Sequence, residues 1–491
     1  MVAGTGIAAV CVALAVGVAP SAVAHGDRSA AHAAVLPGVW QQVSDGSVPA
    51  DAAPAVYRYG NTLQVAWVKQ TGVTSAVRTR MYNALTGAPE GGITTVISGW
   101  SSLNDQVALT TYNGQRMLVF AGIQNISDYP LTQFDQGTLY YALSSDGVNW
   151  TVQSGSISQD TDVLAAIGFS AIDDAGTPMT AFAVSPHSYV GIHRDVSASV
   201  PASTPDTTTA SAPACCVYYP GLGLDTKSHA VWVAWYDNAH KKGWEGINAQ
   251  QVYPAGAHVH APLSSATSLG QQVSQDPEQT VQVAARAGGG LYTGYMTGYP
   301  STTKVVVWKL GAANPTFTIP VHDGNVGLVS VSSSVGGRIW VSWVDPVTHR
   351  LQASRTNAAV TRIGAIRTLT LLKPAFTAGN SVGDGSTGAL DLVATRSSGS
   401  SAISYFTRIL PGLSGSVSKS RVAPRGGFVV TVTDAGAPVA GAAVHFGGST
   451  KHTNAKGKVT FTVPAHAKKG RASVTFSHAG YAGGAVRVTV T

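Results

Sequence analysis

The sequence contains little glutamate, cysteine or charge of either sign. Only three glutamates, Glu90, Glu245 and Glu278, occur in 491 residues, and charged residues make up 11% of the chain. This shortage limits the carboxylate pairs available for acid–base catalysis. The sequence also lacks a G-x-S-x-G elbow, a Walker loop, an H-E-x-x-H motif and a C-x-x-C pair. A serine hydrolase of the α/β type, a nucleotide-binding enzyme and a zinc protease therefore lose their support.

Long helical patterns are missing as well, whereas glycine is abundant. The 55 glycines and the 44% of hydrophobic residues indicate a globular, turn-rich chain rather than a disordered one. The length is several times that of a small domain, so the chain can bury a large core or divide into modules.

The first residues have the pattern of an export signal. Residues 4–24 carry no charge, contain an apolar run from Ile7 to Val18 and end in an Ala-Val-Ala site that a signal peptidase accepts. We expect residues 1–24 to be removed before His25 and residues 25–35 to form a flexible start of the mature chain. An uncleaved anchor is the alternative, because no Lys or Arg precedes Ile7. With no other stretch long enough for a membrane helix, we expect a secreted, extracellular protein that the cell wall could retain.

Only two cysteines, Cys215 and Cys216, remain in the mature chain. Because thiols tend to oxidise outside the cytosol, these neighbours could form a vicinal disulfide, strained by the short distance between adjacent Cα atoms. Two reduced, buried side chains are the alternative.

Seven segments of the chain resemble one another. Each has a turn rich in Gly, Asn or Ser next to an alternating apolar run, and the segments start roughly 48 to 61 residues apart: Asn61–Val68, Gln115–Gly122, Gly176–Val184, His229–Tyr236, Gly289–Met296, Gly337–Val344 and Gly388–Thr395. Regular short strands at this spacing favour radial repetition. We therefore expect an all-β chain with a seven-bladed β-propeller over residues 36–410, with six or eight blades as alternatives. Tryptophans at matching positions are expected to pack between blades: Trp67, Trp232, Trp235, Trp340 and Trp343.

One segment carries a more specific motif. Ser144, Asp146, Gly147 and Trp150 form an S-x-D-G-x-x-W sequence, which resembles the Asp-box of the sialidase-like propeller superfamily. The resemblance implies a structural turn between the two outer strands of a blade, away from the central channel. It does not extend to the catalytic residues, because residues 56–60 read VYRYG without the family's Arg-Ile-Pro motif. The sialidase site residues are therefore not carried over.

The composition changes at residue 414. Residues 414–491 form short alternating runs, and over 436–442 and at Gly457 they resemble bacterial Ig-like or carboxypeptidase-regulatory-like β-sandwiches. This module has a net charge of +9, because Asp434 is its one acid and ten residues are basic: Lys419, Arg421, Arg425, Lys451, Lys456, Lys458, Lys468, Lys469, Arg471 and Arg487. Such a charge attracts anionic polymers. The alternative is a basic surface that only keeps the module soluble. Nucleic acid is not expected as a partner, because no interleaved aromatic and basic motif is present.

Polar residues precede the innermost strand expected in each blade. In a propeller these segments surround one end of the central channel, and here they supply the candidate ligand residues Asp51, Asp105, Asp162, Cys215, Cys216, Tyr218, Asp276, Asp323 and Asp384. Such a ring suits the hydroxyls of a sugar or a hard cation such as Ca²⁺, and no cofactor is required. The simpler alternative is that Asp begins turns and that Tyr218 fills space between blades. His258 and His260 would share one face of a strand, but without further ligand spacing a surface role is favoured over a metal site.

Three classes of function remain. The preferred one is a monomeric, exported propeller that binds a polysaccharide or cell-wall glycan, with a basic module that holds it near anionic polymers. The second is an enzyme at the channel mouth, either a glycosidase using two Asp or a polysaccharide lyase using Tyr and His. The third is a structural or adhesion protein that binds another protein.

Overall fold

The computed structural model describes residues 36–46, 48–49, 53–125, 138–154, 157, 168–184, 188–194, 207–213, 217–237, 241–263, 280–297, 302–324, 329–345, 348, 350–369, 381–398 and 401–491. These residues form β-strands throughout, and their one helical element is the short 3-10 turn η4 (Val335–Gly337). Within the same residues, no helix has the length and apolar character needed to cross a membrane.

Within the described residues, six antiparallel four-stranded sheets follow one another along the chain. The first two consist of β3 (Ala55–Tyr59), β4 (Thr62–Thr71), β5 (Thr74–Asn83) and β6 (Pro89–Trp100), then β7 (Ser102–Tyr112), β8 (Gln115–Ile123), β9 (Thr138–Ser144) and β10 (Thr151–Val152). The next two consist of β11 (Phe169–Asp174), β12 (Thr177–Val184), β13 (Tyr189–Arg194) and β14 (Thr207–Thr208), then β15 (Val217–Leu224), β16 (Val231–Asp237), β17 (Gly246–Tyr253) and β18 (His258–His260). The last two consist of β19 (Val283–Ala285), β20 (Leu291–Thr297), β21 (Thr302–Lys309) and β22 (Phe317–Gly324), then β23 (Val329–Ser334), β24 (Arg338–Val344), β25 (Leu351–Arg355) and β26 (Arg367–Leu369).

A seventh sheet joins the two ends of this series. It contains β27 (Ser381–Asp384), β28 (Leu390–Ser398) and β29 (Ser401–Ile409), and the early strands β1 (Gln41–Gln42) and β2 (Val48–Pro49) both pair with β29. In this pairing Gln41 lies opposite Phe406, and Val48 lies opposite Ala402.

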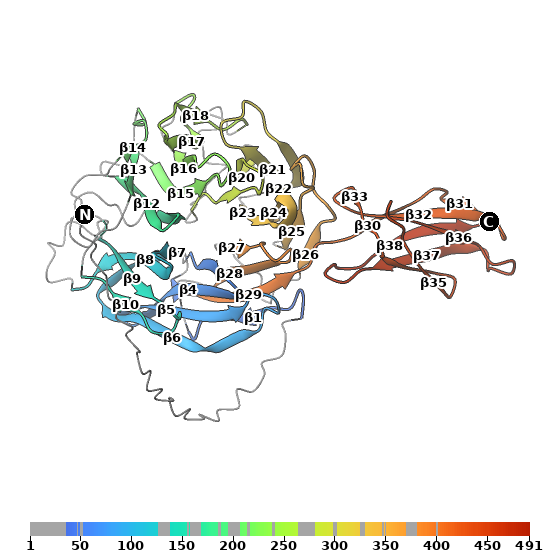
Figure 1. The fold of residues 1–491 in the computed structure, drawn as a ribbon, viewed down its shortest axis with the longest axis horizontal. Coiled ribbons are helices and arrows are strands. Elements are labelled where there is room, and N and C mark those ends of the chain that lie inside the picture. Colours follow the sequence, from blue (N-terminus) through green and yellow to red (C-terminus); the bar gives the residue numbers. More distant parts are fainter. Residues whose placement is uncertain are drawn as a thin grey trace, which may run out of the picture. The chain divides into compact units, whose positions relative to one another are not determined.

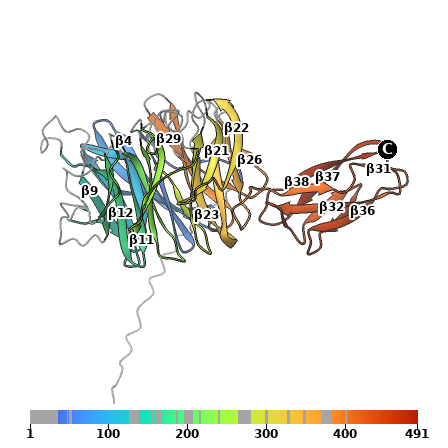
Figure 2. The same ribbon diagram turned by 90° about the horizontal axis from the view of Figure 1, so that it is seen from above.

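The first strands of the seven sheets form a closed ring. β3, β7, β11, β15, β19, β23 and β27 each contact the next, and β27 contacts β3. Figure 1 shows the sheets around a common centre, with β7, β23 and β27 inside and β6 and β18 outside. In Figure 2 the ring is seen from its edge, with strands running from one face to the other. The expected all-β propeller is confirmed. We call the end of its channel where the innermost strands begin the leading end, and the opposite end the trailing end.

Burial explains why the repeats are visible in the sequence. The second strand of each sheet lies between two neighbouring sheets, so both of its faces are covered: every residue of β20 is buried, as are six of the seven residues of β16. Such strands are apolar almost throughout, as strands covered on both faces are. Trp67, Trp235, Trp340 and Trp343 are fully buried, and Trp232 is half-buried, which confirms that they pack in the core.

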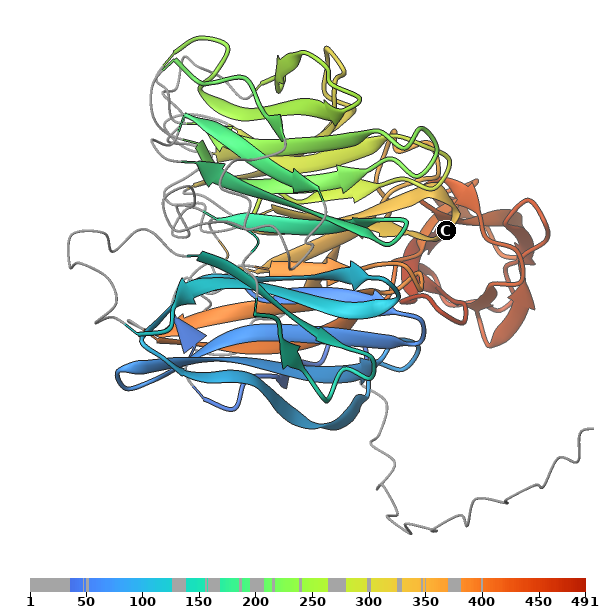
Figure 3. The same ribbon diagram turned by 60° about the vertical axis from the view of Figure 1, so that its left-hand side comes forward.

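Residues 414–491 form a separate pair of sheets. One sheet contains β30 (Ser414–Val417), β32 (Gly427–Asp434), β33 (Ala437–Pro438) and β36 (Lys458–Thr462), and the other contains β31 (Arg421–Val422), β38 (Gly484–Val490), β37 (Gly470–Ser477), β34 (Ala443–Phe446) and β35 (Ser449–His452). Figure 3 shows the two layers nearly end-on. Their strands alternate buried and exposed residues, as in β36, because each sheet has one covered face. Phe428, Phe446 and Phe461 pack together in this core, so the module is a β-sandwich.

Candidate functional site

Most of the predicted ring of ligand residues lies outside the described part of the chain. This applies to Asp51, Asp162, Cys215, Cys216 and Asp276. The disulfide between the two cysteines, and the sharing of one channel mouth by these carboxylates, therefore stay predictions.

Asp105 does lie at the leading end, near the start of β7. It is half-buried, and its carbonyl oxygen accepts a 2.9 Å hydrogen bond from the backbone N–H of Ala53, two residues before β3. The next residue, Gln106, is buried and reaches two further sheets: its Nε2 donates to Thr280 Oγ1 at 3.1 Å, and its Oε1 accepts from Phe169 N at 3.1 Å. Gln106 therefore ties the innermost strands together at this end. A cavity of about 140 Å³ lies beside it among these strands.

Tyr218 lies at the second position of β15 and is half-buried. Its ring packs against Tyr219 at 6.5 Å and Tyr236 at 5.8 Å between centroids, and it borders two core clusters. This position agrees with the alternative that Tyr218 fills space between sheets.

Two predicted residues lie elsewhere than on a segment that enters an innermost strand. Asp323 lies near the end of the outermost strand β22, which ends at the leading end but on the outside of the ring. Asp384 is the last residue of β27, so it lies at the trailing end. The prediction for Asp384 was wrong because only three residues separate it from Gly388, and these three already belong to the turn that follows β27.

Two carboxyl groups and two guanidinium groups meet at the trailing end. Asp384 and Asp391 face each other across β27 and β28. Arg58 Nη1 lies 3.9 Å from Asp384 Oδ2, and Arg408 Nη2 donates to Asp391 Oδ2 at 3.1 Å. Burial raises the pKa of Asp391 to about 8, against the lowering effect of Arg408, and the adjacent Asp384 raises it further. Burial also raises the pKa of Asp384, although Ser386 donates a 2.7 Å hydrogen bond to it.

This carboxyl pair is poorly suited to catalysis on a bound sugar. Asp391 is fully buried, and its Oδ2 atom is occupied by Arg408. A general acid or base must come within hydrogen-bond reach of the substrate, which Asp391 does not in this arrangement. Asp391 instead links β28 to β29 through its hydrogen bond with Arg408.

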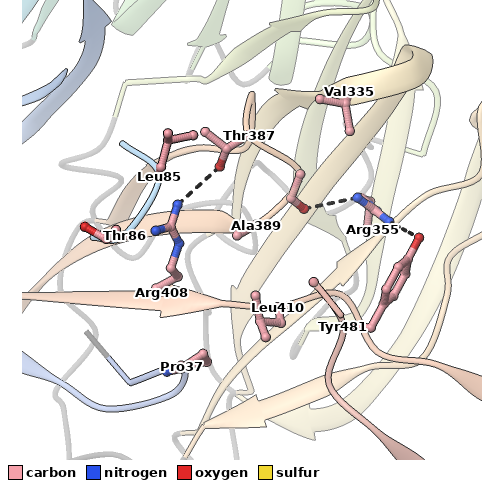
Figure 4. Close-up of a pocket in the computed structure, with 12 residues that line it drawn as sticks. Pro37, Leu85, Thr86, Val335, Arg355, Thr387, Ala389, Arg408, Leu410 and Tyr481 are labelled. Carbon is pink, nitrogen blue, oxygen red and sulfur yellow. Dashed lines mark hydrogen bonds between the residues drawn. The ribbon is translucent and has the colours of Figure 1, made fainter. Parts of the chain in front are cut away.

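A cavity of about 570 Å³ opens beside this cluster (Figure 4). Its polar wall contains Arg408 and Arg355, the hydroxyl-bearing residues Thr86 and Thr387, and Tyr481 of the sandwich. Arg408 donates to Thr387 Oγ1 at 3.3 Å, and Arg355 donates to Tyr481 Oη at 3.3 Å. Both arginines are about 5% exposed, so they form the floor of the cavity rather than its rim.

The rim of the same cavity is apolar. Leu85 is 63% exposed and Val335 is 47% exposed, and Pro37 and Leu410 also line the cavity. A cavity with arginines and hydroxyl groups at its base and aliphatic groups at its rim suits a small organic anion or an acidic sugar.

The only acid of the sandwich is buried against the propeller. Asp434, at the end of β32, is 2% exposed, and its Oδ2 lies 2.5 Å from Arg355 Nη2 and 3.4 Å from Arg338 Nη1. Tyr481 Oη also donates to this carboxylate at 3.3 Å. We call Asp434, Arg355 and Arg338 the ionic clasp. Its two arginines come from β24 and β25 of one propeller sheet.

The basic residues of the sandwich are all on its surface. All ten Lys and Arg side chains of residues 414–491 are exposed. Asp434, which the clasp occupies, is the one Asp or Glu of this module, so no second acidic side chain of residues 414–491 balances their charge.

The S-x-D-G-x-x-W segment forms the turn between β9 and β10. Asp146 Oδ1 accepts from the backbone N–H groups of Val148 and Asn149, each at 2.8 Å, and Ser144 Oγ donates to it at 3.0 Å. The bonds from Asn149 and Val148 hold the pKa of Asp146 well below its ordinary value. Trp150 Nε1 donates to Gly147 O at 3.1 Å, so the turn is closed by its own residues.

His258 and His260 lie on the edge strand β18. Trp244 stacks on His258 with 4.0 Å between ring centroids, and His258 Nε2 lies 2.8 Å from Asn248 Oδ1. Burial lowers the pKa of His258 to about 4. His260 Nε2 contacts the carbonyl oxygen of Glu245 at 2.7 Å. The described residues contain no group of three or more His, Cys, Asp or Glu arranged to hold a metal ion, and the Ca²⁺ prediction gains no site there.

Three parts of the site gave no signal in the sequence. Gln106 directly follows Asn104 and Asp105 in β7, and nothing in the sequence separates its role from theirs. The Arg408–Asp391 and Arg355–Asp434 pairs join residues 17 and 79 positions apart. Only the isolation of Asp434 among ten basic residues could have marked it as a special carboxylate.

Comparisons with known proteins give likeness in fold. No family model and no curated protein matches the sequence. Among solved structures, the chain is similar to a mutant Trypanosoma rangeli sialidase with trans-sialidase activity, at 10% identity and a TM-score of 0.42 over 77% of this chain, and it spans 60% of the sialidase. It is similar to a polysaccharide lyase, an ulvan lyase bound to -[GlcA(1-4)Rha3S]-, at 12% identity and a TM-score of 0.45 over 75% of this chain and 96% of the lyase. An exo-β-1,3-galactanase from Phanerochaete chrysosporium shares 12% identity, with a TM-score of 0.36, over 92% of this chain and 98% of the galactanase. Sialidases and polysaccharide lyases are thus among the solved structures that this all-β chain resembles.

Proposed function

We propose that the chain is an exported carbohydrate-binding β-propeller protein that anionic wall or matrix polysaccharide retains through the basic β-sandwich. The observation that carries the proposal is the separation of charge in the sandwich. Ten cationic side chains are exposed, whereas the single carboxylate is buried in the ionic clasp. Exposed charges act over a Debye length of about 8 Å at physiological salt, so this surface attracts a polyanion without competition from acids of its own module.

The cavity at the trailing end supports the same function. Its buried arginines and hydroxyl groups offer hydrogen-bond donors to an acidic sugar, and its aliphatic rim offers an apolar edge to a sugar ring. The two carboxyl groups beside this cavity favour binding over turnover there, because Asp391 is buried and Asp384 is engaged with Arg58 and Ser386. An Asp-box turn at Ser144–Trp150 and an Ig-like origin of the sandwich belong to this proposal too.

The test uses purified residues 25–491 with a panel of neutral and anionic glycans. Retention and product masses are followed in the same samples, at salt concentrations from about 50 to about 500 mM. We expect retention on anionic glycans that falls steeply with salt, with no change in glycan mass. Retention that does not depend on salt would contradict the role of the basic sandwich.

Two other results would replace the proposal with one of its alternatives. Products of lower mass would show an enzyme, and Asp162→Asn or Asp276→Asn should then abolish turnover while the melting temperature stays nearly unchanged. No retention on any glycan would favour a protein partner.

A further inference from the structure

One face of the sandwich concentrates arginine. The sheet formed by β31, β38, β37, β34 and β35 covers the core with Val422, Val474, Phe476, Val488 and Val490, all of which are buried. Because side chains alternate along a strand, the residues between these point to the opposite, exposed side. Arg421, Arg471 and Arg487 are exposed and occupy such positions.

The strand register places these three arginines close together. Thr489 on β38 lies between Arg421 on β31 and Arg471 on β37, since it is the partner of both. Arg487 lies two residues before Thr489 on β38, opposite Ser473. With strands about 4.8 Å apart and a rise of about 3.3 Å per residue, the three arginine backbones form a triangle with sides of roughly 8 to 10 Å.

The remainder of this face carries Ser, Thr, His and Ala side chains and no acid. Ser473, Thr475 and Ser477 follow Arg471 along β37 on the same side, and all three are exposed. His445 on β34 lies opposite Thr475, and its Nδ1 is 2.7 Å from Thr450 Oγ1. The outward residues of these five described strands include no Asp, Glu, Phe, Tyr or Trp.

The other sheet of the sandwich lacks such a cluster. On β36 the outward residues are Lys458, Thr460 and Thr462, and across from them on β32 are Thr431, Val429 and Gly427. The remaining lysines lie in turns and loops, apart from Lys451 on β35, whose Nζ donates to Thr460 O at 2.9 Å.

We propose that Arg421, Arg471 and Arg487 form the docking surface for a linear polysaccharide that carries carboxylate or sulfate groups. This inference rests on the proposed function. It assigns the binding of anionic polysaccharide to one face of the sandwich rather than to the charge of the whole module. A guanidinium group binds a carboxylate or sulfate through two parallel hydrogen bonds, which an ammonium group does not. The Ser and Thr hydroxyls beside the arginines match the hydroxyls of a sugar chain. A single-stranded nucleic acid would need aromatic side chains for its bases to stack on, and this face has none.

The test compares two full-length variants with equal changes in charge. The first carries Arg421→Gln, Arg471→Gln and Arg487→Gln. The matched control carries Lys419→Gln, Lys456→Gln and Lys468→Gln, which are exposed residues of the same module outside its strands. Binding is measured to dextran sulfate, to the polyuronate alginate and to neutral dextran, with the melting temperature as the measure of folding.

We expect the arginine variant to lose on the order of tenfold in affinity for both anionic polymers, and the lysine variant to lose on the order of twofold. A third variant carries Arg421→Lys, Arg471→Lys and Arg487→Lys and so keeps the charge. It also allows the test if the first variant does not fold. It should bind with intermediate affinity. Loss of alginate binding alone would assign the surface to carboxylate, and loss of dextran sulfate binding alone to sulfate.

Other outcomes would overturn the inference. Equal losses in the arginine and lysine variants would show that overall charge suffices, and the proposed function would stand without this docking surface. The unmodified chain could instead bind DNA or vesicles containing anionic lipid more tightly than it binds either anionic polysaccharide. If the arginine variant then loses that binding, the face belongs to a different macromolecule. Absence of binding to every polysaccharide by the unmodified chain would contradict both this inference and the proposed function.

Discussion

Replacing Asp434 with Asn should destabilise the protein strongly, because it leaves buried arginine charge without a partner. The side chain keeps its shape but loses the charge that faces Arg355 at 2.5 Å and Arg338 at 3.4 Å. Arg355 is nearly as buried as Asp434 itself, whereas Arg338 is more exposed. Removal of one partner from a buried ion pair costs about 3 to 5 kcal/mol. We expect a value near the lower end, about 3 kcal/mol, because Arg338 can reach water.

The assay is urea unfolding followed by two signals. All ten tryptophans lie between residues 40 and 343, so tryptophan fluorescence reports on the propeller alone, whereas far-ultraviolet circular dichroism reports on all strands. Since the clasp joins residues of both modules, the transition of lower stability should move to lower urea concentration in the variant.

Two controls test the reasoning. Asp174→Asn removes a more exposed partner, which faces Arg194 at 3.5 Å, and should cost less than about 1 kcal/mol. Replacing Asp434 by Leu together with Arg355 by Met should recover part of the loss, because apolar groups of similar size do not leave a buried charge. If Asp434→Asn destabilises no more than Asp174→Asn does, the clasp is not a buried ion pair of the kind described.

Three further changes probe other parts of the fold. Asp391→Asn should flatten the pH dependence of the free energy of unfolding. With a pKa of about 8, Asp391 in the folded protein keeps a proton that the unfolded chain loses near pH 4. The free energy of unfolding of the unmodified protein therefore falls by up to about 1.4 kcal/mol per pH unit between about pH 4 and 8. Urea titrations at pH 5 and pH 8 measure this, and equal slopes in both proteins would contradict the raised pKa. Gly147→Ala forces a side chain to φ +81 and should cost about 1 to 2 kcal/mol or more, because the added Cβ also meets the side chains of Arg116 in its own sheet and Gln64 in the neighbouring sheet. Gly114→Ala, at φ +75 with open space around it, isolates the backbone part of this cost in thermal melts. Gln106→Leu removes the acceptor of the buried Phe169 N–H and should lower the free energy of unfolding by about 1 to 3 kcal/mol, and an unchanged urea midpoint would show that this bond contributes nothing.

The propeller could be predicted because its repeats are local. A strand covered on both faces must be apolar along its length, and a tight turn next to it must contain Gly, Asn or Ser. The apolar strand and the turn residues occur within about ten residues of each other, as at His229–Tyr236, where β16 carries the buried Trp235 and Tyr236. The same logic assigned the buried tryptophans to packing.

The site could be predicted only in part, because its contacts are not local. Asp384 was assigned to the wrong end of the channel because the sequence does not mark where a four-residue strand begins. The ionic clasp joins Arg355 to a residue 79 positions away, and no periodicity reports such a pair. The charge of the sandwich was visible by counting, but the grouping of three arginines depends on the register of β31, β38 and β37.

The closing of the ring by β1 and β2 bears on the order of events during synthesis. Val43 donates to Ser404 O at 2.8 Å, and Ser404 N donates to Ser44 Oγ 360 positions earlier in the chain. A chain made from its N-terminus must therefore wait for almost its whole propeller before these early residues find their partners. The entropy of closing a loop grows only as the logarithm of its length, so the delay adds little to the free energy of folding. Until β29 is made, β1, β2 and the outer edge of β28 lack their partner and stay open to other strands, and any chain that stops before residue 401 keeps them open.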